Sequence, residues 1–230
     1  MECLKDILEK FLDEQQERLA KRTFVKYNDV ITLFEDYLDG YAYQHLDEEE
    51  AKSFEKKLFN ESKQYCELYS TDRLDSIELD EFMTYFMIRK VMASQELLKN
   101  TGTVLRKFVK WLKENSYIKE EKFKQLYDTV NEKKGDLPKV EKLSELLYDN
   151  GRRNSIYTYD DYEEDNFIIS KVEDNKLWLE SFLEENKEIG PVKVSKKISS
   201  LAQIGWSVYL VLGKSDGSWF IIESGNVYPE

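Results

Sequence analysis

The side chains that most often carry out chemistry are scarce in this chain of 230 residues, which has one histidine and two cysteines. His45 lies in YAYQHLDEEE, just after the helix stop expected at Gly40. A catalytic histidine needs a nucleophile and an orienting partner. The sequence offers neither, so it favours a structural or surface role for His45. Cys3 and Cys66 stand in unrelated settings, without the spacing of a metal site or of a disulfide framework.

Loops that bind phosphates or hold a nucleophile are also missing from the sequence. No GxGxxG or GxxxxGKS/T pattern occurs. The one GxSxG match, GKSDG at residues 213–217, lies in an expected hairpin turn and not in the strand-to-helix elbow that holds a nucleophile. Two acidic clusters, residues 47–50 and 160–165, could hold a divalent ion. They lack the spaced Asp, Asn and Gly of a calcium loop, which favours solvated acidic runs. We therefore predict a protein that is not an enzyme and that uses no cofactor and no metal.

The most patterned stretch is TGTVLRKFVKWLKENSYI, residues 101–118. On a helical wheel its apolar side chains gather on one arc and its basic side chains fill the rest. Between residues 85 and 113, seven basic residues and one acid give a net charge of +6. The whole chain carries −12, so the remainder carries −18. The candidate DNA-contacting residues, which we term the basic island, are Arg89, Lys90, Lys99, Arg106, Lys107, Lys110 and Lys113.

The basic island leaves two interpretations open. Clustered Lys and Arg can neutralise phosphates and release counterions, which would make the island a DNA-contacting surface. Surface lysines are also ordinary on helices, and acidic neighbours could pair with them. The net charge of −12 disfavours general nucleic-acid binding but allows a local basic patch.

The periodicity of the chain changes once, and this predicts two domains. Residues 1–148 contain one proline and three glycines, and apolar residues recur there at helical spacing. Residues 149–165 are polar, acidic and rich in Tyr, which predicts a linker. Residues 166–230 hold five short β-branched and aromatic runs, with a helical turn at 197–205. The predicted class is α+β, with an all-α bundle followed by a small SH3-like barrel or sheet.

The C-terminal domain is rich in aromatic residues, among them Trp178, Trp206 and Trp219. Rings in so small a domain favour a packed core, and the alternative is a recognition surface for a peptide or protein. From Asn166 onward seven lysines stand against nine acids, so a purely electrostatic DNA surface is not expected there.

The stretch SQELLKNTGTVLRKFVKWL, residues 94–112, resembles the closing helices of the core-binding domain of tyrosine recombinases and phage integrases. That family has a Ser, a Leu-Arg pair, an aromatic residue two positions on, and an aromatic-Leu pair. The matching positions are Ser94, Leu105, Arg106, Phe108, Trp111 and Leu112. RTFVKYNDVITLFEDYL, residues 22–38, resembles the first helix of that domain.

The resemblance covers residues 10–130 and implies a SAM-like bundle that contacts DNA through its basic helices. Ala20 and Leu97 depart from the usual Ser and Thr, and residues 41–75 look like an insertion. Strand cleavage is not implied, because the catalytic domain needs two Arg, a Lys, a His or Trp, and a Tyr. After residue 149 the chain has only two arginines, Arg152 and Arg153, and no histidine.

Two functions follow from these patterns. The first is a non-catalytic DNA-binding or DNA-associated protein, and the alternative is an adaptor that binds proteins without DNA contact. The candidate partners are duplex DNA, a protein bound through the C-terminal domain, and a second copy of the chain. No membrane contact is expected, because no apolar run approaches the roughly 18 residues of a membrane span. The charged start is unlike a signal peptide, and the cysteine usage suits a reducing compartment, so we expect a cytoplasmic protein.

Overall fold

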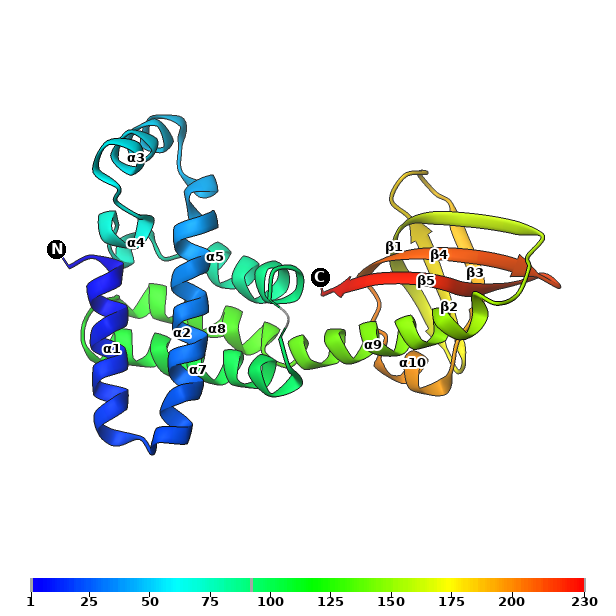
Figure 1. The fold of residues 1–230 in the computed structure, drawn as a ribbon, viewed down its shortest axis with the longest axis horizontal. Helices are drawn as coiled ribbons and strands as arrows, with labels where there is room; N and C mark the ends of the chain where they lie inside the picture. The colour runs from blue at the N-terminus through cyan, green and yellow to red at the C-terminus, as the bar shows by residue number, and fades with distance from the viewer. Residues whose placement is uncertain (1, 92, 230) are drawn as a thin grey trace. The chain divides into compact units, whose positions relative to one another are not determined.

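The computed structural model describes residues 2–91 and 93–229 and divides the chain into two compact units. Unit 1 comprises Met1–Met87 and Glu96–Gly135, and unit 2 comprises Ile88–Gln95 and Asp136–Glu230. Unit 1 is helical, whereas unit 2 holds a five-stranded sheet (Figure 1). The predicted α+β class is confirmed, since helices precede a C-terminal sheet.

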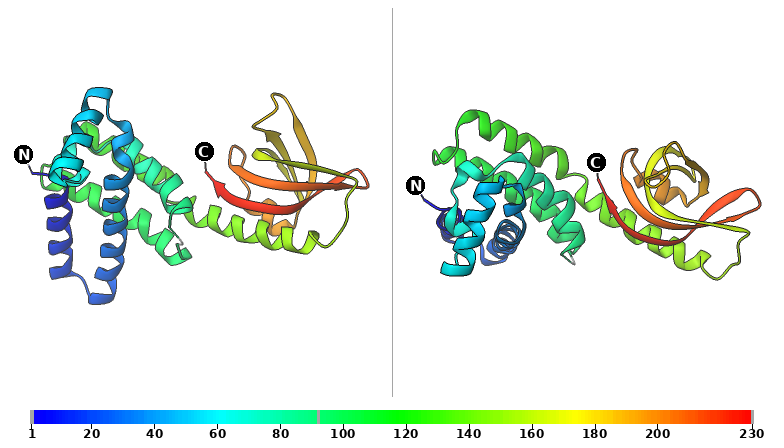
Figure 2. Two further views of the ribbon diagram at one scale, coloured as in Figure 1. Left: turned by 45° about the horizontal axis from the view of Figure 1, so that its top comes forward. Right: turned by 90° about the horizontal axis from the view of Figure 1, so that it is seen from above.

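Unit 1 is built from long and short helices. The helices are α1 (Leu4–Arg18), α2 (Lys21–Tyr41), α3 (Glu48–Glu61), α4 (Tyr65–Leu68), α5 (Ser76–Glu81), α7 (Gln95–Glu114) and α8 (Glu120–Lys133). Two 3-10 turns, Ala42–His45 and Thr71–Arg73, lie between them. A π-helical segment, Phe82–Phe86, leads from α5 to the short α6 (Met87–Arg89). The antiparallel helices α1 and α2 lie side by side (Figure 2).

Three aromatic side chains join α1, α2 and α7 in the core of unit 1. Phe11, Phe34 and Phe108 are at most 1 % exposed. The ring of Phe108 meets the other two edge-on, with centroids 5.1 Å from Phe11 and 6.4 Å from Phe34. Aromatic pairs favour this geometry. The apolar arc predicted for residues 104–112 is therefore the buried face of α7, and its basic side chains lie on the other faces of that helix.

Two segments with helical periodicity are interrupted in the structure. Residues 47–69 form α3 and α4, because Ser62 ends α3 in the left-handed region with φ of 55°. Of the second segment, residues 76–89 form α5, the π-helical segment and α6. A capping box between Asp75 and Glu78 starts α5, with the N–H of Asp75 donating to the Glu78 carboxylate at 2.7 Å. The first segment is thus divided into two α-helices, whereas the second changes helical type along its length.

Unit 2 is built on the five predicted strands. These are β1 (Asp161–Glu173), β2 (Lys176–Ser181), β3 (Glu188–Lys193), β4 (Ser207–Ser215) and β5 (Ser218–Tyr228). They pair in the order β1-β2-β3-β5-β4, and β4 pairs with β1, so the sheet closes on itself. All neighbours are antiparallel except β3 and β5, which pair in parallel at Val192–Trp219 and Lys193–Phe220. The short helix α10 (Lys196–Leu201) lies between β3 and β4, where a helical turn was predicted.

The domain boundaries lie elsewhere than predicted, because helix α9 (Leu137–Asn154) belongs to unit 2 with the sheet. The predicted linker at 149–165 instead supplies the end of α9 and the start of β1. Ser144 Oγ accepts from the N–H of Val227 at 2.9 Å, and Asn154 donates to the carbonyl of Ile221 at 2.9 Å. These bonds satisfy backbone groups of β5 beyond its short pairing with β3. Gly151 allows the approach, since a Cβ there would lie 2.7 Å from the carbonyl oxygen of Ile222.

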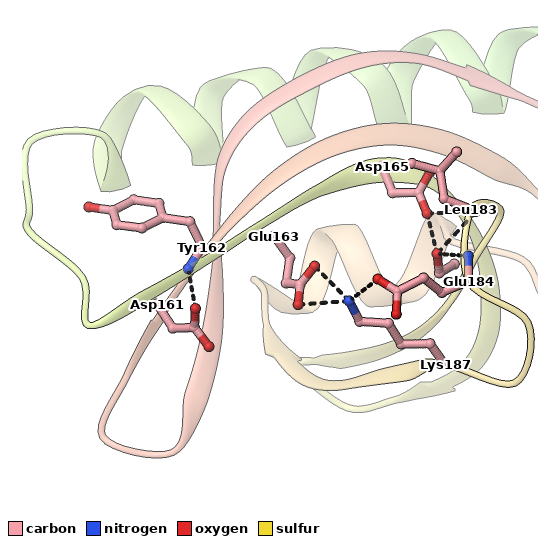
Figure 3. A network of polar contacts seen from close by, with 8 residues as sticks. Asp161, Tyr162, Glu163, Asp165, Leu183, Glu184 and Lys187 are labelled. Carbon is pink, nitrogen blue, oxygen red and sulfur yellow. Dashed lines mark hydrogen bonds and ion pairs between the residues drawn. The ribbon is translucent and has the colours of Figure 1, made fainter.

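A polar network ties the β2–β3 loop to β1 (Figure 3). Asp165 accepts from the Ser181 hydroxyl and, at 3.0 Å, from the backbone N–H of Leu183. Lys187 bridges Glu163 at 2.8 Å and Glu184 at 2.7 Å. Burial raises the pKa of Asp165, but its hydrogen bonds outweigh burial and hold that pKa below its ordinary value. Part of the acidic cluster at 160–165 therefore has a structural role.

Candidate functional site

Helix α7 carries four members of the basic island on one stripe. Lys99, Arg106, Lys110 and Lys113 follow one another at intervals of seven, four and three residues. Such intervals place side chains on one side of an α-helix. Lys99 and Lys110 are exposed, and Arg106 and Lys113 are partly exposed. The opposite side of α7 is buried in the core, so this stripe is held on a rigid element.

Helix α8 extends this stripe into a wider surface. The Cβ of Lys134, at the end of α8, would lie 2.3 Å from a Cβ added at Gly102, so glycine lets the two helices approach. Lys110 Nζ lies 5.3 Å from the ring centroid of Tyr127 on α8. Lys124 precedes Tyr127 by one helical turn. We define the α7/α8 basic face as Lys99, Arg106, Lys110, Lys113, Lys124 and Lys134.

Most cations of the α7/α8 basic face have no carboxylate partner. Lys113 pairs with Glu120 at 2.9 Å. Lys134 donates to the side-chain oxygen of Asn131 at 2.6 Å instead. Within the described residues no ion pair involves the other five cations of the face, including Lys134. Their charge is therefore available to an anionic ligand.

The pKa of Tyr127 is influenced by positive charges on α7. Burial raises the pKa of Tyr127, but a hydrogen bond with Asn131 and the positive charges of Lys110 and Arg106 outweigh burial. The pKa of this phenol consequently lies below its ordinary value. The other tyrosines with a shifted pKa in the described chain have it raised. Lys110 and Arg106 thus add to the effect of the Asn131 hydrogen bond on this phenol.

The remaining members of the basic island lie outside this face. Lys107 follows Arg106 by one residue, which turns its side chain about 100° away from the stripe. Lys107 and Lys110 both line a cavity of about 270 Å³ whose lining also includes Arg18, Glu14 and Glu114. Arg89 and Lys90 belong to unit 2, where Arg89 donates to the Tyr228 hydroxyl at 3.2 Å. The structure therefore brings together four of the seven predicted residues, all on α7.

His45 lines a second cavity of about 560 Å³ in unit 1. Its Nε2 lies 2.7 Å from Oε2 of Glu81, which also accepts from the Tyr37 hydroxyl at 2.7 Å. The Glu81 carboxylate thereby links a 3-10 turn to α2 and α5. The lining holds two hydroxyls, and neither donates to His45: Ser76 donates to Asp75, and Thr129 donates to the carbonyl of Gln125. These contacts give His45 a structural role and assemble no base with a nucleophile.

No group of three or more His, Cys, Asp or Glu side chains in residues 2–91 and 93–229 is arranged to hold a metal ion. In that same part of the chain, no helix is long and apolar enough to cross a membrane. Both cysteines are free, and burial raises the pKa of the Cys66 thiol.

The sequence patterns missed the contribution of α8. Lys124 and Lys134 belong to a helix of mixed charge, and their position beside α7 depends on helix packing. The signal that could have found them is Gly102, because a glycine inside a helical pattern often marks a close approach.

No family model, no curated protein and no solved structure matches this chain.

Proposed function

We propose that this protein is a non-catalytic DNA-binding protein that holds the phosphates of a duplex on the α7/α8 basic face. The observation that carries the proposal is the group of five cations without a carboxylate partner on two adjoining helices. Lys and Arg that neutralise phosphates release condensed counterions, and this release favours binding. In an acidic chain, such a face is the part of unit 1 with the right charge.

The stripe on α7 is long enough to reach several phosphates along a duplex. The interval from Lys99 to Lys113 corresponds to about 20 Å along a helix axis, at about 1.5 Å per residue. That length equals about six base-pair steps of about 3.4 Å each. Because α7 is anchored through Phe108 and Leu112, which are fully buried, its cations are held on a rigid helix.

The resemblance to the recombinase core-binding domain supports duplex DNA as the ligand, since Arg106 lies in both the matched motif and the face. A SAM-like bundle for unit 1 is part of the same proposal. For unit 2, the parallel β3–β5 pair and the helix between β3 and β4 favour a five-stranded Greek-key barrel over the SH3-like barrel expected from sequence.

The proposal is tested by measuring duplex binding with fluorescence anisotropy over a range of salt. The test variant is Arg106→Glu with Lys110→Glu. The control is Lys56→Glu with Lys57→Glu, which makes the same change of charge at exposed positions on α3. We expect the test variant to lose about tenfold or more in affinity, with a log–log salt slope shallower by about 1.8. The control should keep the wild-type slope.

Two outcomes would contradict DNA binding by this face. One is a wild-type protein that binds no duplex at low salt, and the other is an equal loss in the test and control variants. The first outcome would favour the adaptor function. The second would indicate that only the total charge of the protein matters.

A further inference from the structure

The outer surface of the closed sheet displays two aromatic rings, each with a lysine over it. Lys171 Nζ lies 4.5 Å from the ring centroid of Trp178 on β2, and Lys193 Nζ lies 5.2 Å from that of Phe220 on β5. The strand neighbours of both rings are buried, namely Leu177, Leu179, Trp219 and Ile221. Because side chains alternate along a strand, Trp178 and Phe220 point away from the core. Both rings are partly exposed.

The strand register brings these groups onto one surface. Lys193 on β3 is the register partner of Phe220 on one side and of Lys176 on the other. β3 separates β2 from β5, which places those strands about 10 Å apart. A Cβ added at Gly190 on β3 would lie 2.4 Å from Cδ1 of Trp178, so the indole lies against the backbone of β3. The side of the ring away from the sheet is left to Lys171 and to solvent.

Further rings continue this surface beyond Phe220. The centroid of Tyr159 lies 5.9 Å from that of Phe220 and 6.2 Å from that of Tyr162. Tyr159 lies over Gly213, where a Cβ would be 2.4 Å from its Cγ. We define the strand face as the rings of Trp178, Phe220 and Tyr159 with Lys171, Lys176 and Lys193.

We propose that the strand face binds single-stranded nucleic acid, with bases stacked on Trp178 and Phe220 and phosphates beside Lys171, Lys176 and Lys193. Aromatic rings beside cations are the usual means of holding a single strand, because every base has a face that can stack. A duplex hides those faces within its own stack. The proposal goes beyond duplex binding by the α7/α8 basic face and does not depend on it.

The charges around the strand face favour one side of it for the phosphates of the ligand. Glu180 and Glu188 are register partners on β2 and β3, so the surface beyond Trp178 is acidic and repels phosphates. Lys176 and Lys193 make no ion pair within the described residues. Lys171 pairs with Glu173 at 2.8 Å, but both side chains are about half exposed, and such pairs are weak enough to exchange for a phosphate. We thus expect the sugar-phosphate backbone of the nucleic acid on the side of Lys176 and Lys193.

Binding is tested with the full chain and labelled oligothymidylate or oligouridylate of about 15 nucleotides. Trp178→Leu removes the aromatic ring, and Trp178→Phe keeps one. We expect Trp178→Leu to weaken binding about 5- to 100-fold and Trp178→Phe to recover most of the loss. Lys193→Glu should weaken binding and reduce its salt dependence. Lys197→Glu, an exposed change of equal charge on α10, should leave binding near the wild-type value.

Several results would overturn the proposal. These are no binding of either oligonucleotide at low salt, wild-type binding by Trp178→Leu, or an equal effect of Lys193→Glu and Lys197→Glu. A polyglutamate peptide that binds more tightly than both oligonucleotides would assign the face to a protein partner instead. Comparison of the two oligonucleotides distinguishes DNA from RNA. Thermal melting of each variant shows that it is folded, and duplex binding by Trp178→Leu separates failure here from failure of the α7/α8 basic face.

Discussion

The α7/α8 basic face and the strand face both contain cationic side chains, but the surroundings of these side chains differ. On the helices, the stripe from Lys99 to Lys113 extends over about 20 Å. Five of the six cations of that face have no carboxylate partner among the described residues, and Lys110 lies beside the ring of Tyr127. On the sheet, Lys171 and Lys193 each lie over an aromatic ring. A row of cations matches regularly spaced phosphates, whereas ring and cation pairs match unstacked bases with their phosphates. On this ground we propose duplex DNA for the α7/α8 basic face and single-stranded nucleic acid for the strand face.

The acidic residues of the chain differ from these cations in how they are used. Asp47 caps α3 by accepting from the N–H groups of Glu49 and Glu50 at 3.0 and 2.9 Å. Glu163 and Asp165 hold the β2–β3 loop. Part of the acidic charge of the chain thus belongs to carboxylates that cap a helix or hold a loop.

The largest expected effect tests whether the two regions have separate cores. Phe108→Ala should destabilise unit 1 by about 3–5 kcal/mol, because Phe108 is fully buried against Phe11 and Phe34. Hydrogen exchange should then quicken in α1, α2 and α7, while the strands of unit 2 keep their protection. An equal loss of protection in both units would show one cooperative core and would weaken the comparison.

A smaller effect is expected at the strand face from Gly190→Ala. The added Cβ would lie 2.4 Å from Cδ1 of Trp178, so the indole must move from its position on β3. We expect a loss of single-strand affinity of about fivefold or more, the effect of losing one stacked base. Duplex affinity should not change, and both can be measured by anisotropy. Gly135→Ala, where a Cβ meets nothing within 4 Å, is the control. Unchanged single-strand binding would exclude Trp178 as the platform.

The smallest effect concerns a buried acid of unit 1. Burial raises the pKa of Glu78 above its ordinary 4.5, so the folded state holds this charge less well than the unfolded state. The resulting penalty is absent below the ordinary pKa and grows as pH rises through the higher pKa of the folded state. Glu78→Gln should therefore raise the melting temperature slightly at pH 7, with the gain shrinking toward pH 4.5.

The matched change at an exposed acid, Glu48→Gln on α3, should show no such pH dependence. If Glu78→Gln instead lowers the melting temperature at pH 7, then acceptance from the N–H of Asp75 needs the charged carboxylate. The carboxylates of unit 1 would then stabilise the fold through their charge as well as through their shape.

The sequence by itself determined the α+β class, the five strands and the amphipathic character of α7. These features were predictable because hydrophobic periodicity is local and follows the geometry of each helix or strand. The apolar arc around Phe108 and the alternation along β4 and β5 each point to one buried side. The spacing of Lys99, Arg106 and Lys110 on one stripe follows from that same local geometry.

Only the tertiary structure decided which of these cations lie close together. Lys134 lies against α7 because Gly102 leaves room for it, and Lys107 and Lys110 line one cavity together with Glu14 and Glu114 of two different helices. Trp178 lies on Gly190, and Lys193 meets Phe220, through pairing between strands that are distant in sequence. Helix α9 packs on the sheet, where its side chains form hydrogen bonds with backbone groups of β5. Such contacts depend on chain segments meeting in space, and periodicity within one segment holds no information about its partner.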